Sequence, residues 1–153
     1  RQKMFPIKKI LCPTDFSDPS YEGLKKAIEI AEHFTAELIL VHIVSPIPNI
    51  VGTGSPTGFH FPMVLEEMEA QATKKIEADA VDHIPDHIRS KTIVKTGRPA
   101  DQIVETAVEE KAQIIVMATH GQSGWQRFVS GSVTERVVRM ATCPVFVVPA
   151  PEE

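Results

Sequence analysis

Short apolar runs, rich in β-branched residues, alternate along the chain with longer amphipathic segments. Continuous apolar runs of this length are typical of strands that are buried on both faces of a parallel sheet. The sequence therefore predicts five strands. They lie at residues 9–13, 37–44, 92–94, 113–117 and 144–148.

The segments between these runs repeat apolar residues at helical spacing. After the first run, Leu24 and Ala27 fall on one helical face, and lysine and glutamate occupy the opposite one. Asp18 is in position to cap this helix, with Pro19 in its first turn. Three more helices follow. The second helix of the chain has apolar residues at Leu65, Met68, Ala72 and Ile76 and should end before Pro85. The third has Ile103, Val104, Ala107 and Val108, and the fourth spans residues 133–140.

The regular alternation of strands and helices predicts an α/β fold, an open parallel sheet with helices on both faces, Rossmann-like in character. We expect one domain spanning residues 1–153, and we interpret the residues before Met4 as upstream or added sequence. Ligands of such sheets bind beyond the carboxyl ends of the strands, where the winding reverses. A reversal between the first and fourth strands would bring the loop at Thr14 and Asp15 opposite residues 118–131.

Residues 45–62 contain four prolines and three glycines, so they predict a long irregular loop. Part of it, residues 52–58, superficially resembles a dinucleotide-binding fingerprint. That interpretation is rejected, because the segment includes a proline and lacks the required strand before it and helix after it.

Composition narrows the class of protein. The 153 residues include 16 Lys and Arg against 20 Asp and Glu, and 42% are hydrophobic, which argues against a disordered chain and against a nucleic-acid partner. No apolar run approaches the about 20 residues of a membrane helix, and no leader peptide is expected. Cys12 and Cys143 lack metal-binding or redox spacing, which favours a reducing compartment. We therefore expect a cytoplasmic protein without membrane contact.

The segment after the fourth strand carries the strongest chemical signal. Met117 and Ala118 end the strand, Gly121 follows, and Gly131, Ser132 and Val133 lead into the last helix with Thr134. Glycines let backbone N–H groups approach an anion, and a helix N-terminus adds unpaired donors and a positive dipole end. Two ordinary turns and a capped helix would explain the same spacing, so both interpretations stay open on the pattern alone.

Over nearly its whole length the chain resembles the universal stress protein (UspA) family. Its ATP-binding members have Gly, two residues, Gly, nine residues and Gly-Ser/Thr after the fourth strand; here the positions are Ala118, Gly121, and Gly131-Ser132. Residues 13–15, 133–137 and 143–145 are also similar to the family. The resemblance implies a strand order of 3-2-1-4-5, an ATP site between the loops after strands one and four, and a role in stress regulation or binding.

Carried over by position, the resemblance assigns Asp15 and Val41 to the adenosine part and Ala118 to the ribose. Gly121, Gly131, Ser132 and Val133 would hold the phosphates of ATP, with or without a bridging Mg²⁺. Ala118 departs from the ATP-binding pattern, which has glycine at this position, and its methyl group crowds the site. The full set implied for ATP is Pro13, Thr14, Asp15, Val41, Met117, Ala118, Gly121, Gly131, Ser132, Val133 and Thr134.

The last strand would lie at an edge of this sheet. Val145, Phe146, Val147 and Val148 are apolar and carry no charge, and exposed edges of this kind pair with another chain. The family resemblance likewise implies a homodimer, in which these strands run antiparallel across a twofold axis.

Three other motifs in the sequence are incomplete. Asp15 and Thr119 invite comparison with a phosphate-accepting receiver domain, but the further acidic residues for magnesium are missing. No Gly-Lys-Ser/Thr motif is present, so no catalytic residue is assigned and at most weak ATP hydrolysis is expected. His83 and His87 have metal spacing, but Pro85 between them disfavours it and no metal is expected. An ATP-using enzyme and a family member that binds no nucleotide remain the alternatives.

Overall fold

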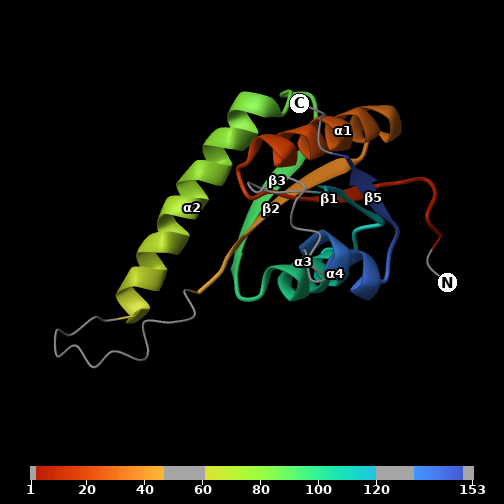
Figure 1. Cartoon of the computed structure of the whole chain (residues 1–153). Coiled ribbons are helices and arrows are strands. Elements are labelled where there is room, and N and C mark those ends of the chain that lie inside the picture. The colour runs from red at the N-terminus through yellow and green to blue at the C-terminus, as the bar shows by residue number, and fades with distance from the viewer. Residues whose placement is uncertain (1–2, 47–60, 120–132, 150–153) are drawn as a thin grey trace, which may run out of the picture.

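A parallel sheet of five strands in the order β3-β2-β1-β4-β5 forms the centre of the molecule, as predicted (Figure 1). The structure, a computed structural model, describes residues 3–46, 61–119 and 133–149. The strands are β1 (Lys9–Pro13), β2 (Glu37–Val44), β3 (Ser90–Thr96), β4 (Ile114–Ala118) and β5 (Val145–Val148).

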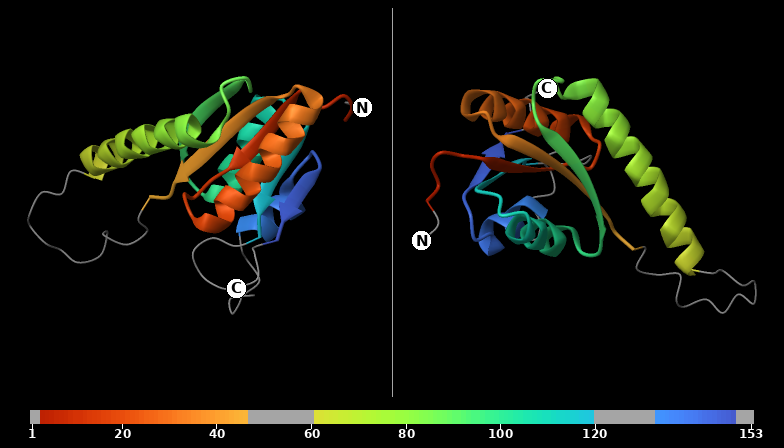
Figure 2. Two further views of the ribbon diagram at one scale, coloured as in Figure 1. Left: turned by 90° about the horizontal axis from the view of Figure 1, so that it is seen from above. Right: turned by 180° about the vertical axis from the view of Figure 1, so that it is seen from behind.

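Helices cover both faces of this sheet. They are α1 (Asp18–Phe34), α2 (Phe61–His83), α3 (Pro99–Glu109) and α4 (Val133–Met140). α1 and α2 lie on one face, and α3 and α4 on the other (Figure 2). In the part of the chain that the structure describes, no helix is both long and apolar enough to cross a lipid bilayer.

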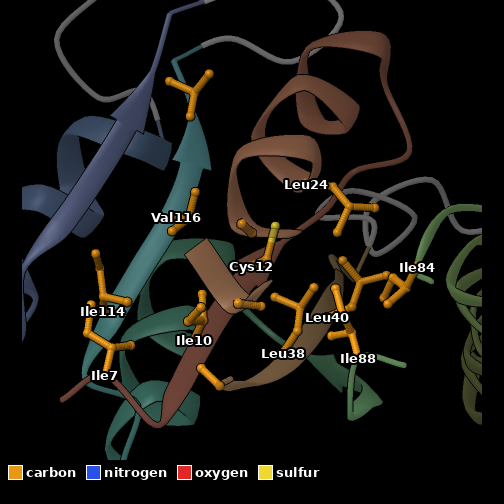
Figure 3. Close-up of a cluster of buried hydrophobic side chains, with 14 of the residues drawn as sticks. Ile7, Ile10, Cys12, Leu24, Leu38, Leu40, Ile84, Ile88, Ile114 and Val116 are labelled. Carbon is orange, nitrogen blue, oxygen red and sulfur yellow. The ribbon is translucent and has the colours of Figure 1, made fainter. Parts of the chain in front are cut away.

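The core has two layers, one on each face, because successive strand residues point to opposite sides. Ile10 and Cys12 of β1 belong to the layer under α1 and α2, and Leu11 to the layer under α3 and α4. The first layer is drawn in Figure 3. Burial raises the pKa of the Cys12 thiol to about 12, so this cysteine is a neutral apolar side chain at ordinary pH.

Two predictions about where helices begin are wrong. Ser17, not Asp18, is the N-cap of α1, and its side chain accepts a hydrogen bond from the Ser20 N–H. The long loop cannot extend to Pro62, because α2 begins at Phe61. A proline is tolerated there, since the first turn of a helix has no partner for its N–H. The rest of the predicted loop, from residue 47 to residue 60, lies outside the described residues.

The strand ends shift slightly, because pairing with neighbours rather than apolar content sets them. β3 extends from Ser90 to Thr96, with every residue paired to β2. On α3, Val108 was expected to be buried but is 57% exposed. Thr106 is buried instead, and its hydroxyl donates to the Gln102 carbonyl at 2.6 Å.

α1 crosses β4 at very close range. A Cβ atom added at Gly23 would lie 3.2 Å from the backbone N of Ala118 and 3.5 Å from the carbonyl carbon of Met117. A larger side chain would therefore have to move the backbone at the carboxyl end of β4.

We expect Gly23→Leu to lower the free energy of unfolding by about 1–3 kcal/mol, because the added side chain overpacks this contact. Urea unfolding followed by circular dichroism measures the change. Lys25→Leu, on the exposed face of the same helix, is the control and should change the value by less than about 0.5 kcal/mol. Equal stability of both variants would contradict the close contact.

Candidate functional site

A cavity of about 320 Å³ opens at the carboxyl ends of β1, β2 and β4. It lies where the winding reverses, since β1 and β4 are neighbours in the sheet but not in the sequence. The starts of α3 and α4 complete its walls. Its lining residues are Pro13, Thr14, Asp15, Ser20, Val41, His42, Ile43, Ser45, Pro99, Ile103, Met117, Ala118, Thr119, Val133 and Thr134.

The structure brings together in this one cavity every predicted site residue that it describes. These residues come from the end of β1, the middle of β2, the end of β4 and the start of α4. They are Pro13, Thr14, Asp15, Val41, Met117, Ala118, Val133 and Thr134. The other three predicted residues, Gly121, Gly131 and Ser132, lie outside the described residues.

Several residues that line the cavity are not in the set predicted for ATP. Ser20 lies in the first turn of α1, Thr119 follows β4, and Pro99 and Ile103 belong to the start of α3. A further three are His42 and Ile43, near the carboxyl end of β2, and Ser45, directly after it. Their position after Val41 could have identified them, because the carboxyl end of β2 lies beside that of β1.

Side chains and backbone fix the turn between β1 and α1. The Thr14 N–H donates to the Val41 carbonyl at 2.8 Å, and the Phe16 N–H donates to Thr14 Oγ1 at 3.0 Å. Asp15 Oδ1 accepts hydrogen bonds from the N–H and the hydroxyl of Ser17. Asp15 itself is exposed, and its second carboxylate oxygen has no hydrogen bond among the described residues. That oxygen is therefore available to a hydrogen-bond donor from outside the chain.

The start of α4 is tied to the end of β4. The Thr134 hydroxyl donates to the Ala118 carbonyl at 2.8 Å, and the Thr119 N–H donates to the Val148 carbonyl at 3.0 Å. The first turn of α4 is thereby held at the cavity. Its N-terminal N–H groups and the positive end of the helix dipole can stabilise a negative charge there.

Charge is sparse in this cavity. Of its lining residues in the described part of the chain, only Asp15 carries a carboxylate, and none is a lysine or arginine. Much of the wall is apolar, formed by Val41, Ile43, Ile103 and Met117. The arrangement can hold a flat apolar ring and hydroxyl groups, and its described walls offer an anion main-chain N–H groups and hydroxyls rather than a lysine or arginine.

His83 and His87, whose spacing resembles a metal pair but was not expected to bind one, contact different residues. His87 Nε2 lies 2.9 Å from Glu32 Oε1, and the His83 ring packs against Tyr21 with centroids 4.6 Å apart. The Tyr21 pKa is raised to about 12 by burial and by its hydrogen bond to Asp79. Over residues 3–46, 61–119 and 133–149, no three acidic, cysteine or histidine side chains are grouped so that they could hold a metal ion.

Residues 6–149 match the sequence model of the universal stress protein family. Universal stress protein MJ0531 of Methanocaldococcus jannaschii is 39% identical over 149 residues, which cover 95% of this chain and 84% of that protein. Universal stress protein YxiE of Bacillus subtilis is 31% identical, over 93% of this chain and 99% of the relative.

Solved structures have the same fold. Universal stress protein UspA from Lactobacillus plantarum superposes with a TM-score of 0.76 at 24% identity, covering 93% of this chain and 97% of that one. A universal stress protein described in complex with cAMP has a TM-score of 0.61 at 23% identity, covering 94% and 97%. One from Archaeoglobus fulgidus, in complex with dAMP, has a TM-score of 0.55 at 22% identity, covering 92% and 96%.

The family match over nearly the whole chain, the relatives' identities and the shared fold lead to one conclusion. This chain belongs to the universal stress protein family.

Proposed function

We propose that this chain binds ATP and acts as a cytoplasmic regulator or binding module in a stress response. One observation carries the proposal: the residues that the ATP-binding pattern assigns, wherever the structure describes them, line a single cavity at the switch point of the sheet. Two structurally similar family members are described with adenine nucleotides, cAMP and dAMP, which supports a ligand of this class.

Different walls of the cavity match the base, the ribose and the phosphates of a nucleotide. Its apolar wall around Val41 and Met117 would pack against the base, which is flat and largely apolar. The free oxygen of Asp15 would accept hydrogen bonds from ribose hydroxyl groups, since an ionised carboxylate only accepts. Val133 and Thr134, in the first turn of α4, would lie nearest the phosphates.

The phosphates would be held by the main chain. Gly121, Gly131 and Ser132 are proposed for this role from the motif, with Mg²⁺ bridging phosphate oxygens as an optional part of the complex. Because no lysine or arginine lines the described cavity, main-chain N–H groups and the α4 dipole would supply the compensating charge. This chemistry favours binding over turnover, because phosphoryl transfer requires cationic groups around the reacting phosphate.

We also propose a homodimer through β5, formed by Val145, Phe146, Val147 and Val148. The two edge strands of the sheet differ in charge: β3 carries lysines and β5 carries no charged residue. On β3, Lys91 forms an ion pair at 2.6 Å with Glu110, the residue directly after α3, and Lys95 forms one at 2.7 Å with Glu109, the last residue of α3. Charged side chains of this kind discourage pairing with another sheet.

β5 carries no charged residue, and Phe146 is 46% exposed. Val138 and Met140 of the neighbouring α4 are 52% and 42% exposed. An uncharged edge with exposed apolar side chains beside it favours pairing with a second copy.

Calorimetric titration with ATP, together with mass spectrometry of nucleotide released on denaturation, tests the proposed ligand. We expect measurable ATP binding and no turnover above background. Ala118→Leu should abolish binding because its side chain occupies the cavity, whereas Ala118→Gly should bind at least as tightly as the natural chain. Undiminished binding in the leucine variant would contradict the site, and sustained ATP turnover would favour the enzyme alternative.

Asp15→Ala should weaken ATP binding by about tenfold, the effect of losing a hydrogen bond to a charged acceptor. If the carboxylate contacts the ribose, the variant should bind ATP and 2′,3′-dideoxy-ATP with nearly equal affinity. The natural chain should prefer ATP. Titrations of both proteins with both nucleotides form a double-mutant cycle, and a preference that survives in the variant would assign the ribose contact elsewhere.

Phe146→Lys should convert the proposed dimer to a monomer, because two lysines would meet across the twofold axis in an apolar contact. Sedimentation velocity at micromolar concentration measures the change. Val108→Lys, which replaces a similarly exposed apolar residue on α3, is the matched control and should leave the dimer intact. A natural chain that sediments as a monomer would contradict the proposal.

A further inference from the structure

The turn that carries Asp15 has an unusual backbone conformation. Phe16, the next residue, has a φ of 65°, in the left-handed region that residues other than glycine rarely adopt. Such a conformation persists only where surrounding contacts hold it, and it often marks a functional site. The contacts of Phe16 and of Thr14, the residues on either side of Asp15, therefore decide how Asp15 is presented.

Thr14 is held by two consecutive residues of β2. Its N–H donates to the Val41 carbonyl at 2.8 Å, and its carbonyl oxygen lies 2.8 Å from His42 Nδ1. A carbonyl oxygen can only accept, so Nδ1 of His42 must carry the proton and donate. The last paired residues of β1 and β2 are Pro13 and Val41. Beyond them, the hydrogen bond to the Thr14 carbonyl comes from the His42 side chain instead of a backbone N–H.

Phe16 is held by the same histidine. The Phe16 and His42 rings lie 4.4 Å apart between centroids, with an angle of 35° between their planes. Lys75 of α2 places its Nζ 4.4 Å from the centroid of the Phe16 ring, within the range of a cation–π contact. His42 thus touches both neighbours of Asp15, the carbonyl of Thr14 before it and the ring of Phe16 after it.

His42 is partly buried and lines the cavity, and its Nε2 has no hydrogen bond within the described residues. Within the described part of the chain, the polar and ring contacts of the His42 side chain are therefore the Nδ1 hydrogen bond and the contact with Phe16, and both go to this turn. A residue needed only for core packing would not require a donor at that ring position.

We propose that His42 is a positioning residue for the ligand. By holding Thr14 and Phe16, it fixes the turn so that the free carboxylate oxygen of Asp15 is presented to the cavity. This inference rests on the proposed nucleotide function. His42 acts through the turn and takes no part in bond making or breaking.

Two substitutions separate the hydrogen bond from the space that the ring fills. His42→Leu removes the donor, whereas His42→Asn keeps an amide N–H donor near the position of Nδ1. We expect the leucine variant to bind ATP about fivefold to tenfold more weakly, and the asparagine variant to recover most of that loss. His87→Leu, which removes an exposed histidine of the described chain outside the cavity, is the matched control and should bind like the natural chain.

Titration calorimetry measures the affinities, and thermal unfolding without nucleotide shows that each variant is folded at the temperature of titration. A leucine variant that binds as tightly as the natural chain would overturn the inference. Equal losses in the asparagine and leucine variants would overturn it too, because they would point to packing alone. If the natural chain binds no adenine nucleotide, the proposed function itself fails, and with it this role of His42.

A spectroscopic signature gives a second test that needs no nucleotide. In ¹⁵N-histidine-labelled protein at a pH where His42 is neutral, long-range ¹H–¹⁵N correlations should identify a proton on Nδ1 and none on Nε2. Assignment follows from loss of the signals in His42→Asn. A neutral His42 protonated on Nε2 would overturn the inference even if ATP binds, since Nδ1 could not then donate to Thr14.

Discussion

The reversal of winding between β1 and β4 determines where this sheet leaves room for a small ligand. Right-handed connections carry the chain from β1 through β2 to β3 with α1 and α2 on one face, and then back to β4 with α3 on the other. The helices that follow the two central strands therefore leave on opposite faces. Among the described residues no helix covers the carboxyl ends of β1 and β4, and a cavity lies beyond them.

Much of this architecture could be predicted from the sequence, because burial on two faces leaves a direct pattern. β1 and β2 are continuous apolar runs, and their predicted bounds agree with the structure. β3 was predicted too short, since only its centre is apolar and its ends depend on pairing with β2. The strand order itself came from the family resemblance, as periodicity along a chain carries no information on which strands are neighbours.

Details of the site depended on hydrogen bonds that no spacing rule identifies. Ser17 and Asp18 are both good cap residues, and Ser17 is the cap because its backbone is extended, with φ −79° and ψ 160°, and its side chain accepts from the Ser20 N–H. The contact of His42 with Thr14 joins residues 28 positions apart. Likewise the Gln113 side chain accepts hydrogen bonds from the N–H groups of Lys8 and Lys9, which could not be foreseen from a polar residue before a strand.

The central claim is that an adenine nucleotide occupies the cavity between β1 and β4 without a lysine or arginine from its described walls. A crystal structure of the chain grown with excess ATP and Mg²⁺ tests this most directly. The account predicts electron density for the base beside Val41, the ribose at Asp15 and the phosphates at the start of α4. Nucleotide density at the amino ends of the strands, or none at all in the cavity, would contradict it.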